Sequence, residues 1–304
     1  MTGRRQSIAV VGVGSIGGVA AAALANSGRH DLAVCMRQPV AALTLETAEE
    51  ALHVPIRALG DPGEAATVDW VLLCTKAQAT ESTAPWLARL CEPGTRVAVL
   101  QNGIDHAARV APYIGGARAV PVIVYYNGER LAPDRVRLRR VNPHDLIVGD
   151  DADAAAFADL FVGSPLSVLC SGDFTTVAWR KLLLNVVANP ITALTLQRQS
   201  VFQRADIRAL GLAIAEEAVA VGRAAGARLE ADEAAQVMAM VLRIPPDSGS
   251  SMYFDRLAGR SLEIEALTGA LVAAGERLGV ATPLNKAMLT LLRVVSETAA
   301  VTKI

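Results

Sequence analysis

Apolar and polar residues follow two different patterns along this chain, and the change comes at about residue 171. Before it, short apolar runs typical of strands alternate with segments typical of helices. We expect strands at residues 8–11, 31–36, 69–74, 96–100 and 120–125, and helices at residues 19–26, 39–52, 85–90 and 152–161. This alternation predicts an α/β domain over residues 1–171.

After residue 171 the apolar residues recur at helical spacing only. We expect helices at residues 175–189, 206–225, 231–244, 262–278 and 283–298. Pro190 should disrupt the first of these helices after Asn189, because proline cannot donate a backbone hydrogen bond. Glu263 falls in the first turn of the helix expected at 262–278. The pattern predicts an all-α domain over residues 172–304.

A glycine-rich turn joins the first expected strand to the first helix. Its pattern, G-x-G-x-x-G, has glycine at Gly12, Gly14 and Gly17, with Ser15 and Ile16 between the last two. In this context the pattern is the dinucleotide-binding fingerprint of a Rossmann-type domain, in which backbone N–H groups at the helix start hold a pyrophosphate. The alternative is a glycine-rich turn that binds nothing.

Arg37 follows the second expected strand, about 20 residues after the last fingerprint glycine. An NAD site normally has an acidic residue there to bind the ribose 2′-hydroxyl. A guanidinium instead offers paired donors to a 2′-phosphate, so the position favours NADP(H). The alternative is a surface arginine without a ligand.

Two further polar groups follow expected strands. Lys76 comes after residues 69–74, and Asn102 and Gly103 come after residues 96–100. Ligands of open α/β sheets bind at the carboxyl ends of the strands, so Lys76 and Asn102 are candidates for binding cofactor or substrate. A solvated loop lysine and an ordinary Asn-Gly turn are the alternatives.

The helix expected at residues 175–189 carries Lys181, Asn185 and Asn189 four residues apart. This spacing places an ammonium and two amides along one side of a helix that is otherwise apolar. Polar groups on a largely buried helix usually have a partner, which points to a substrate site. The alternative is a helix whose polar face meets solvent.

Composition limits the partners and the compartment. The 304 residues are 52% hydrophobic and 19% charged with a net charge of −1, which argues against nucleic acid or an anionic membrane as the main partner. We interpret Arg135, Arg137 and Arg139 as the solvated face of an edge strand. No apolar run of membrane-spanning length and no signal peptide is evident, so we expect a cytoplasmic protein.

The four cysteines and four histidines are scattered along the chain. We expect the cysteines to be small buried residues in a reducing compartment, and the histidines to be ordinary surface or loop residues. Their spacing indicates no metal site. These residues are Cys35, Cys74, Cys91, Cys170, His30, His53, His106 and His144.

Together these motifs resemble the ketopantoate reductase family, the 2-dehydropantoate 2-reductases. The resemblance is carried, in order along the chain, by the glycine turn, Arg37, Thr75-Lys76, Gln101-Asn102-Gly103, Trp179 to Leu182, Asn185, Asn189-Pro190, Ser251-Met252, Asp255 and Glu263. It implies a Rossmann domain joined to a 6-phosphogluconate dehydrogenase-like helical domain, with the active site between them. The implied reaction is NADPH-dependent reduction of 2-dehydropantoate to pantoate, in pantothenate formation.

The resemblance also implies roles for single residues. Lys181 matches the general acid, and Asn185 and Asn189 match amides that bind the substrate. Ser251 and Glu263 match groups that hold the polar end of the substrate. Lys76 and Asn102 match residues beside the nicotinamide.

Where many members of the family have a further asparagine near the substrate, this chain has Gln199 nearby. Residues 125–130 do not match closely either. Both departures leave open the reduction of another 2-keto acid. A non-catalytic NADP(H) sensor is a third reading. The sequence does not decide between a monomer and a homodimer.

Overall fold

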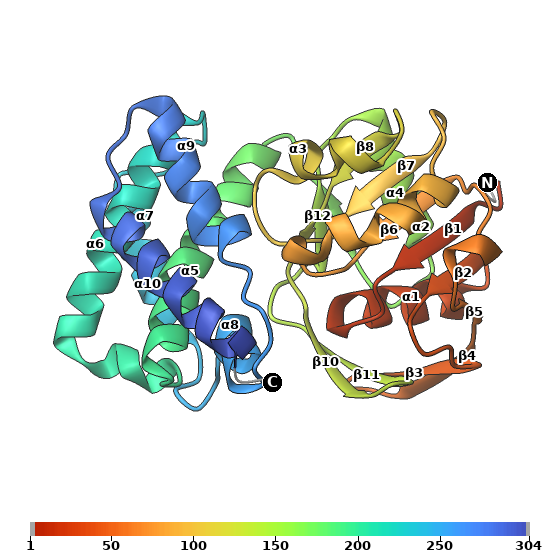
Figure 1. Cartoon of the computed structure of the whole chain (residues 1–304), viewed down its shortest axis with the longest axis horizontal. Coiled ribbons are helices and arrows are strands. Elements are labelled where there is room, and N and C mark those ends of the chain that lie inside the picture. Colours follow the sequence, from red (N-terminus) through yellow and green to blue (C-terminus); the bar gives the residue numbers. More distant parts are fainter. Residues whose placement is uncertain (1–3, 302–304) are drawn as a thin grey trace. The chain divides into compact units, whose positions relative to one another are not determined.

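The computed structural model describes residues 4–301, with side chains to residue 297. The chain divides into two compact units that meet in sequence between Phe174 and Thr175. The first unit combines sheets and helices, and the second unit is helical in its described part (Figure 1).

Six parallel strands form the main sheet of the first unit. Their order is β5 (Arg57–Leu59), β2 (Asp31–Cys35), β1 (Ser7–Val11), β6 (Trp70–Leu73), β7 (Arg96–Val99) and β8 (Arg118–Pro121). On β1, Val10 lies between Val34 and Leu72 in register, and these three side chains share one buried cluster. Val11 and Leu73 belong to a second buried cluster. Successive strand residues point to opposite faces, so the expected α/β sheet with both faces buried is confirmed.

Residues 4–173 form four α-helices, α1 (Ser15–Ser27), α2 (Ala84–Leu90), α3 (His106–Val110) and α4 (Ala152–Leu160). Residues of α1 and α4 pack in the cluster of Val10, and residues of α2 and α3 pack in the cluster of Val11. The helices therefore cover both faces of the sheet, as the alternating sequence pattern predicts.

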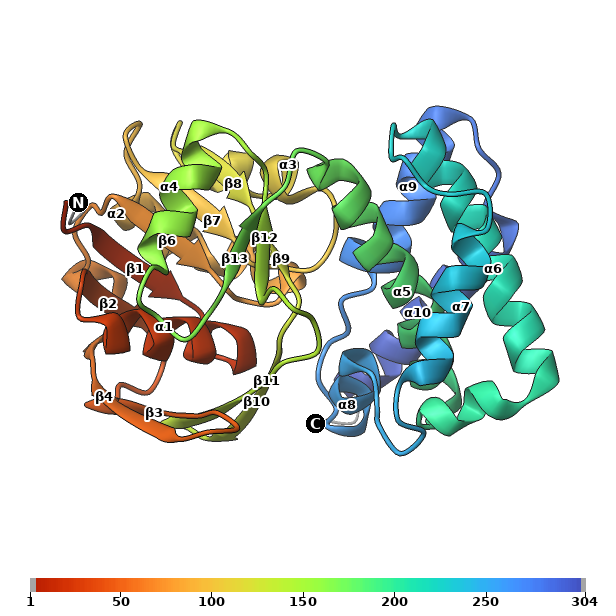
Figure 2. The same ribbon diagram turned by 180° about the vertical axis from the view of Figure 1, so that it is seen from behind.

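A second sheet lies against α1, on the side away from β1 (Figures 1 and 2). Its order is β10 (Asn127–Ala132), β11 (Arg135–Arg139), β3 (Ala42–Glu46) and β4 (Ala51–Pro55). The helix predicted at residues 39–52 is therefore wrong. Leu43 and Leu45 are fully buried while Thr44 between them is partly exposed, and this period of two lets the strand pack its apolar side against α1.

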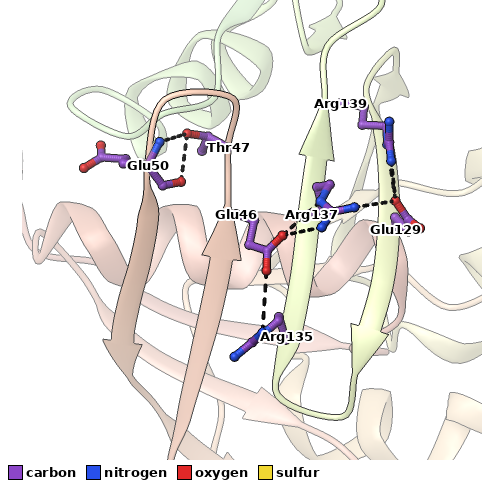
Figure 3. Close-up of polar contacts among 7 residues, drawn as sticks. All are labelled: Glu46, Thr47, Glu50, Glu129, Arg135, Arg137 and Arg139. Atoms are coloured by element: carbon purple, nitrogen blue, oxygen red, sulfur yellow. Dashed lines mark hydrogen bonds and ion pairs between the residues drawn. The ribbon is translucent and has the colours of Figure 1, made fainter.

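The three arginines of β11 lie on the solvent side of this sheet, but β11 is an inner strand between β10 and β3. The prediction of an edge strand is wrong because residues 42–46 form the strand β3, which pairs with β11 on the side away from β10. In register, Arg137 stands opposite Glu129 of β10 and Glu46 of β3. Arg137 donates to Glu46 at 2.7 and 2.9 Å, and Arg139 lies 3.0 Å from Glu129 (Figure 3). The arginine stretch is an ion-pair ladder across three strands.

A third sheet has the order β13 (Val168–Cys170), β12 (Leu146–Val148) and β9 (Ile123–Val124), with β12 antiparallel to β9. Short 3₁₀ turns complete the connections, η1 (Pro62–Glu64), η2 (Ala77–Ala79), η3 (Glu81–Thr83), η4 (Ala111–Tyr113) and, in the second unit, η5 (Gln199–Gln203).

The helical unit consists of α5 (Phe174–Thr195), α6 (Ala205–Ala224), α7 (Glu233–Arg243), α8 (Ser251–Leu257), the π-helical segment η6 (Glu265–Gly269), α9 (Ala270–Leu278) and α10 (Pro283–Val301). The carboxylate of Glu217 on α6 accepts backbone N–H groups of Leu284 and Asn285 at 2.8 and 3.0 Å. A side chain of α6 therefore caps the start of α10.

Pro190 lies inside α5 and does not end it, so the predicted break after Asn189 is wrong. Val187 and Ala188 before the proline and Ile191 after it are all buried. Packing on both sides of the proline outweighs the one backbone hydrogen bond that it removes.

Two expectations about scattered residues need correction. Cys35 and Cys74 are buried as expected, but Cys91 is half-buried and Cys170 is exposed. His30 and His106 are buried, whereas a surface or loop position was expected. Within residues 4–301, we find no helix with the length and apolar character that crossing a bilayer requires.

Candidate active site

The three fingerprint glycines between β1 and α1 differ in their surroundings. Gly12 has a φ of +95°, and a Cβ there would lie 2.5 Å from Cγ2 of Thr75. A Cβ on Gly17 would overlap the carbonyl oxygen of Gly12. A Cβ on Gly14 would meet nothing within 4 Å. Packing explains the first and third glycines, whereas the second fits a ligand that approaches the backbone, such as a pyrophosphate.

The start of α1 keeps its N–H groups available. The first helical hydrogen bond runs from Gly18 to Gly14, so the N–H groups of Ser15, Ile16 and Gly17 lie before it. The cap residue Gly14 has no side chain to accept them, and the first turn contains no acidic residue. These amides and the positive end of the helix dipole suit an anion, so the turn fits a dinucleotide.

Arg37 is exposed directly after β2. It makes no hydrogen bond or ion pair with the part of the chain that the structure describes. A guanidinium without a carboxylate partner can take a 2′-phosphate without breaking an existing pair.

The polar groups after β6 and β7 are joined by one buried side chain, that of Gln101. Its amide nitrogen donates to the hydroxyl of Thr75 at 3.1 Å and to that of Thr80 at 3.0 Å. Lys76 and Asn102 follow Thr75 and Gln101 directly in sequence, and they are exposed and half-buried respectively. The two strand ends that carry the candidates are therefore connected, as expected for neighbouring parallel strands.

Two residues that sequence reasoning did not select hold this loop. Nε2 of His106 lies 2.8 Å from the backbone oxygen of Gln101, and Arg109 donates to the backbone oxygen of Asn102 at 3.0 Å. Burial lowers the pKa of His106 to about 4, so the imidazole is neutral and gives its one N–H to the carbonyl. The only sequence signal for this pair is its position, just after a strand end.

In the second unit, α5 carries the predicted ammonium and amides. Lys181 and Asn185 are half-buried, and Asn189 is only 4% exposed. The unbroken helix keeps all three along one side, about one turn apart. The amide nitrogen of Asn189 is buried without a hydrogen-bond partner in the described residues. Such a donor is costly to bury unless a ligand takes it.

Burial also lowers the pKa of Lys181, from 10.5 to about 8. An ammonium with this pKa gives up its proton near neutral pH far more readily than an ordinary lysine does. The neighbouring Arg180 is paired with Glu233 of α7, at 2.8 and 3.0 Å through two nitrogens. This bidentate pair fixes the turn of α5 that carries Lys181.

The start of α8 is attached to the turn of α5 that follows Asn189. The hydroxyl of Ser250 lies 2.7 Å from that of Thr192, and it also accepts the backbone N–H of Tyr253 as the cap of α8. Ser251 is the next residue and is exposed. The structure therefore brings Ser251 to the same end of α5 as Asn189.

Gln199 belongs to the same region. Its backbone N–H donates to the carbonyl oxygen of Ser248 at 2.9 Å, in the loop that leads to α8. The side chain is 5% exposed, and its oxygen has no partner among the described residues. Gln199 therefore adds a buried acceptor to the group formed by Asn189 and Ser251.

Glu263 is buried at 4% exposure, but it precedes its helix, so the predicted place in a first turn is wrong. Its neighbours Leu262 and Ile264 are both buried and hold the segment against the unit. The following helix begins at Glu265 with a π-helical turn, a feature often found at functional sites. Over residues 4–301, no three His, Cys, Asp or Glu side chains are grouped in a way that could hold a metal ion.

Comparison with known proteins identifies the family from both units of the chain. Residues 8–152 match the family model described as ketopantoate reductase PanE/ApbA, and residues 173–296 match the model of its C-terminal part. The chain belongs to the ketopantoate reductase family. The family recognised from the sequence motifs is thus confirmed.

Named relatives agree over nearly the full length. The chain is 40% identical over 286 residues to the 2-dehydropantoate 2-reductase of Caulobacter vibrioides, with 94% of this chain and 98% of the relative covered. It is 38% identical over 292 residues to that of Mycobacterium tuberculosis, with 95% and 98% covered. The crystal structure of a PanE/ApbA family ketopantoate reductase from Ralstonia eutropha has a TM-score of 0.86 at 27% identity and covers 97% and 99%. The predicted fold class is also confirmed.

Proposed function

We propose that this protein catalyses the NADPH-dependent reduction of 2-dehydropantoate to pantoate, a reaction of pantothenate formation. The observation that carries the proposal is on α5, where an ammonium of lowered pKa and a buried amide nitrogen with no hydrogen-bond partner among the described residues lie on one side of the helix. Membership of the ketopantoate reductase family and the dinucleotide turn support it.

The cofactor residues are proposed from the first unit. The N–H groups of Ser15, Ile16 and Gly17 would hold the pyrophosphate, with Gly12 and Gly14 shaping the turn. Arg37 would hold the 2′-phosphate, which selects NADPH over NADH. Lys76 and Asn102, at the ends of adjacent strands, would bind beside the nicotinamide.

Lys181 is proposed as the general acid. NADPH, when bound, would supply a hydride to the C2 carbonyl carbon of the keto acid, so that negative charge would develop on the carbonyl oxygen. The Lys181 ammonium donates a proton to that oxygen and stabilises the charge before the transfer is complete. The neutral amine then takes a proton from water, which a pKa of about 8 favours at neutral pH.

The remaining polar groups are proposed to orient the substrate. Asn185 and Asn189 would offer amide donors to the keto acid, and Ser251 and Glu263 would hold its polar end. The side-chain oxygen of Gln199, which has no partner within the described part of the chain, is an acceptor. The 4-hydroxyl of 2-dehydropantoate is a donor of the kind that this acceptor needs, which favours this substrate over keto acids without a hydroxyl.

The test follows NADPH oxidation by absorbance with 2-dehydropantoate as substrate, and with NADH in parallel. We expect turnover with NADPH and little with NADH. Lys181→Ala should lower kcat by about two to four orders of magnitude and leave NADPH binding nearly unchanged. Lys286→Ala is the matched control, because Lys286 is an exposed lysine of α10 whose ammonium pairs with Glu276 of α9. Its kcat should equal that of the wild type.

Lys181→Arg separates charge from proton transfer. Arginine keeps the positive charge but does not release a proton, so this variant should also be nearly inactive. Full activity in folded Lys181→Arg would remove Lys181 from the role of acid. A wild-type protein that binds NADPH but reduces none of a panel of 2-keto acids would instead favour the sensor reading.

The cytoplasmic location and the homodimer remain predictions. Light scattering after size-exclusion chromatography measures the molar mass directly. A value near twice the 31.8 kDa of one chain supports the homodimer, and a value near 31.8 kDa rejects it.

A further inference from the structure

A strand far along the chain lies against the first turn of α1. The hydroxyl of Tyr126 donates to the carbonyl oxygen of Ile16 at 2.8 Å, across 110 residues of sequence. Two residues later, the backbone of Gly128 on β10 touches the backbone of Ser15. A Cβ on Gly128 would overlap the carbonyl oxygen of Ser15 and lie 2.6 Å from its carbonyl carbon. Both contacts are made to the cofactor turn, and they come from residues 125–130, which match no family motif closely.

The two contacted carbonyls belong to two particular peptide groups. The carbonyl of Ser15 shares its peptide plane with the N–H of Ile16, and the carbonyl of Ile16 shares its plane with the N–H of Gly17. In a trans peptide the C=O and N–H point in opposite directions, so a group that holds the carbonyl also fixes where the N–H points. These N–H groups are two of the three that precede the first helical hydrogen bond.

The Tyr126 hydroxyl is a dependable donor. The side chain is 3% exposed, and burial raises the pKa of its phenol well above the ordinary value, so it keeps its proton. The segment itself is pinned, because the backbone N–H of Tyr125 donates to the carbonyl oxygen of Asp145 at 2.8 Å. A hydrogen bond to a carbonyl also makes the N–H of the same peptide a stronger donor.

We propose that Tyr126 and Gly128 are positioning residues for the cofactor: they hold the Ser15–Ile16 and Ile16–Gly17 peptide planes so that their N–H groups face the pyrophosphate. The inference rests on the proposed NADPH dependence. It assigns to residues 126–128, at the start of β10, a part of the nucleotide site that the glycine fingerprint alone does not contain.

The test compares Tyr126→Phe, which removes only the hydroxyl, with the wild type. We expect the Kd for NADPH, measured by fluorescence titration, and the KM for NADPH to rise about five- to tenfold, the effect of one hydrogen bond, with kcat at saturating NADPH within about twofold. Binding of adenosine 2′-monophosphate, which has no pyrophosphate, should be unchanged. Tyr113→Phe is the control, because its hydroxyl has no partner within the described residues.

Gly128→Ala supplies a second, larger perturbation, because the added Cβ must displace the backbone of Ser15. We expect its NADPH affinity to fall by more than that of Tyr126→Phe. An unchanged Kd for NADPH in Tyr126→Phe overturns the inference, as does an equal loss of affinity for adenosine 2′-monophosphate, which indicates a general structural effect. A wild-type protein that binds no NADPH rejects the proposed cofactor, and with it this role.

Discussion

Replacing Lys181 by methionine should make the protein more stable and inactive at the same time. The pKa of this lysine is about 8 instead of 10.5 because the ammonium is desolvated. One pKa unit corresponds to about 1.4 kcal/mol, so keeping the ammonium charged in the folded protein at neutral pH costs about 3 kcal/mol. Methionine has a similar length and no charge, and it removes this cost.

The expected gain at pH 7 is about 2–3 kcal/mol in the free energy of unfolding, measured by urea denaturation and circular dichroism. This gain in the free energy of unfolding should decrease as the pH rises. Below about pH 8 both the folded and the unfolded wild type hold the proton, and the penalty is complete. Between about pH 8 and 10.5 the folded state loses the proton first, so the wild type gains stability relative to the variant and the difference narrows.

The matched control is Lys286→Met, at an exposed lysine that pairs with Glu276 at 3.0 Å. Loss of an exposed ion pair changes stability by less than about 1 kcal/mol, with little dependence on pH over this range. A Lys181→Met protein that is less stable than the wild type at pH 7 would refute the reasoning, because the ammonium would then stabilise the fold.

Three further predictions concern the two units separately. Arg37→Ala should raise the KM for NADPH about tenfold or more and hardly change that for NADH, and equal changes for both would reject the 2′-phosphate role. Gly14→Ala should have the melting temperature of the wild type but bind NADPH poorly in a titration, whereas Gly17→Ala should have a lower melting temperature. Glu233→Gln should cost about 2–3 kcal/mol near pH 7. Burial raises the pKa of Glu233, but the hydrogen bonds from Arg180 and from the backbone N–H of Glu230 outweigh burial and lower this pKa below 4.5. The difference in the free energy of unfolding between variant and wild type should therefore vanish as the pH falls through that lowered pKa.

The sequence contains the nucleotide turn and the α5 polar face in local patterns, which is why both could be predicted. Gly12 and Gly17 are required by contacts within one strand–turn–helix unit, and Lys181 and Asn189 follow helical spacing. The sequence does not predict the strands β3 and β4, because each has only five residues, too few for an alternation of apolar and polar residues to stand out. Their conformation is fixed by packing against α1, which a local pattern does not contain.

The same limit applies to the parts that support the site. Pro190 continues a helix because of buried neighbours on both sides, against its local preference. His106 contacts a backbone oxygen five residues away, and Tyr126 contacts one that is 110 residues away. Backbone acceptors carry no residue identity, so no sequence motif marks the side chains that bind them.

The second sheet has a consequence for how the protein is made. β11 lies parallel beside β3, and Arg137 reaches Glu46 across 91 residues. On the ribosome, the glycine turn leaves the exit tunnel early and β3 and β4 follow soon after, but β10 and β11, the other two strands of the sheet against α1, arrive only after residue 126 has been synthesised. Such non-local pairing is slow to form, because a long loop must close first. The nucleotide turn is thus among the first elements translated and among the last to be completed, because a nascent chain that ends before residue 127 lacks two of the four strands in the sheet against α1.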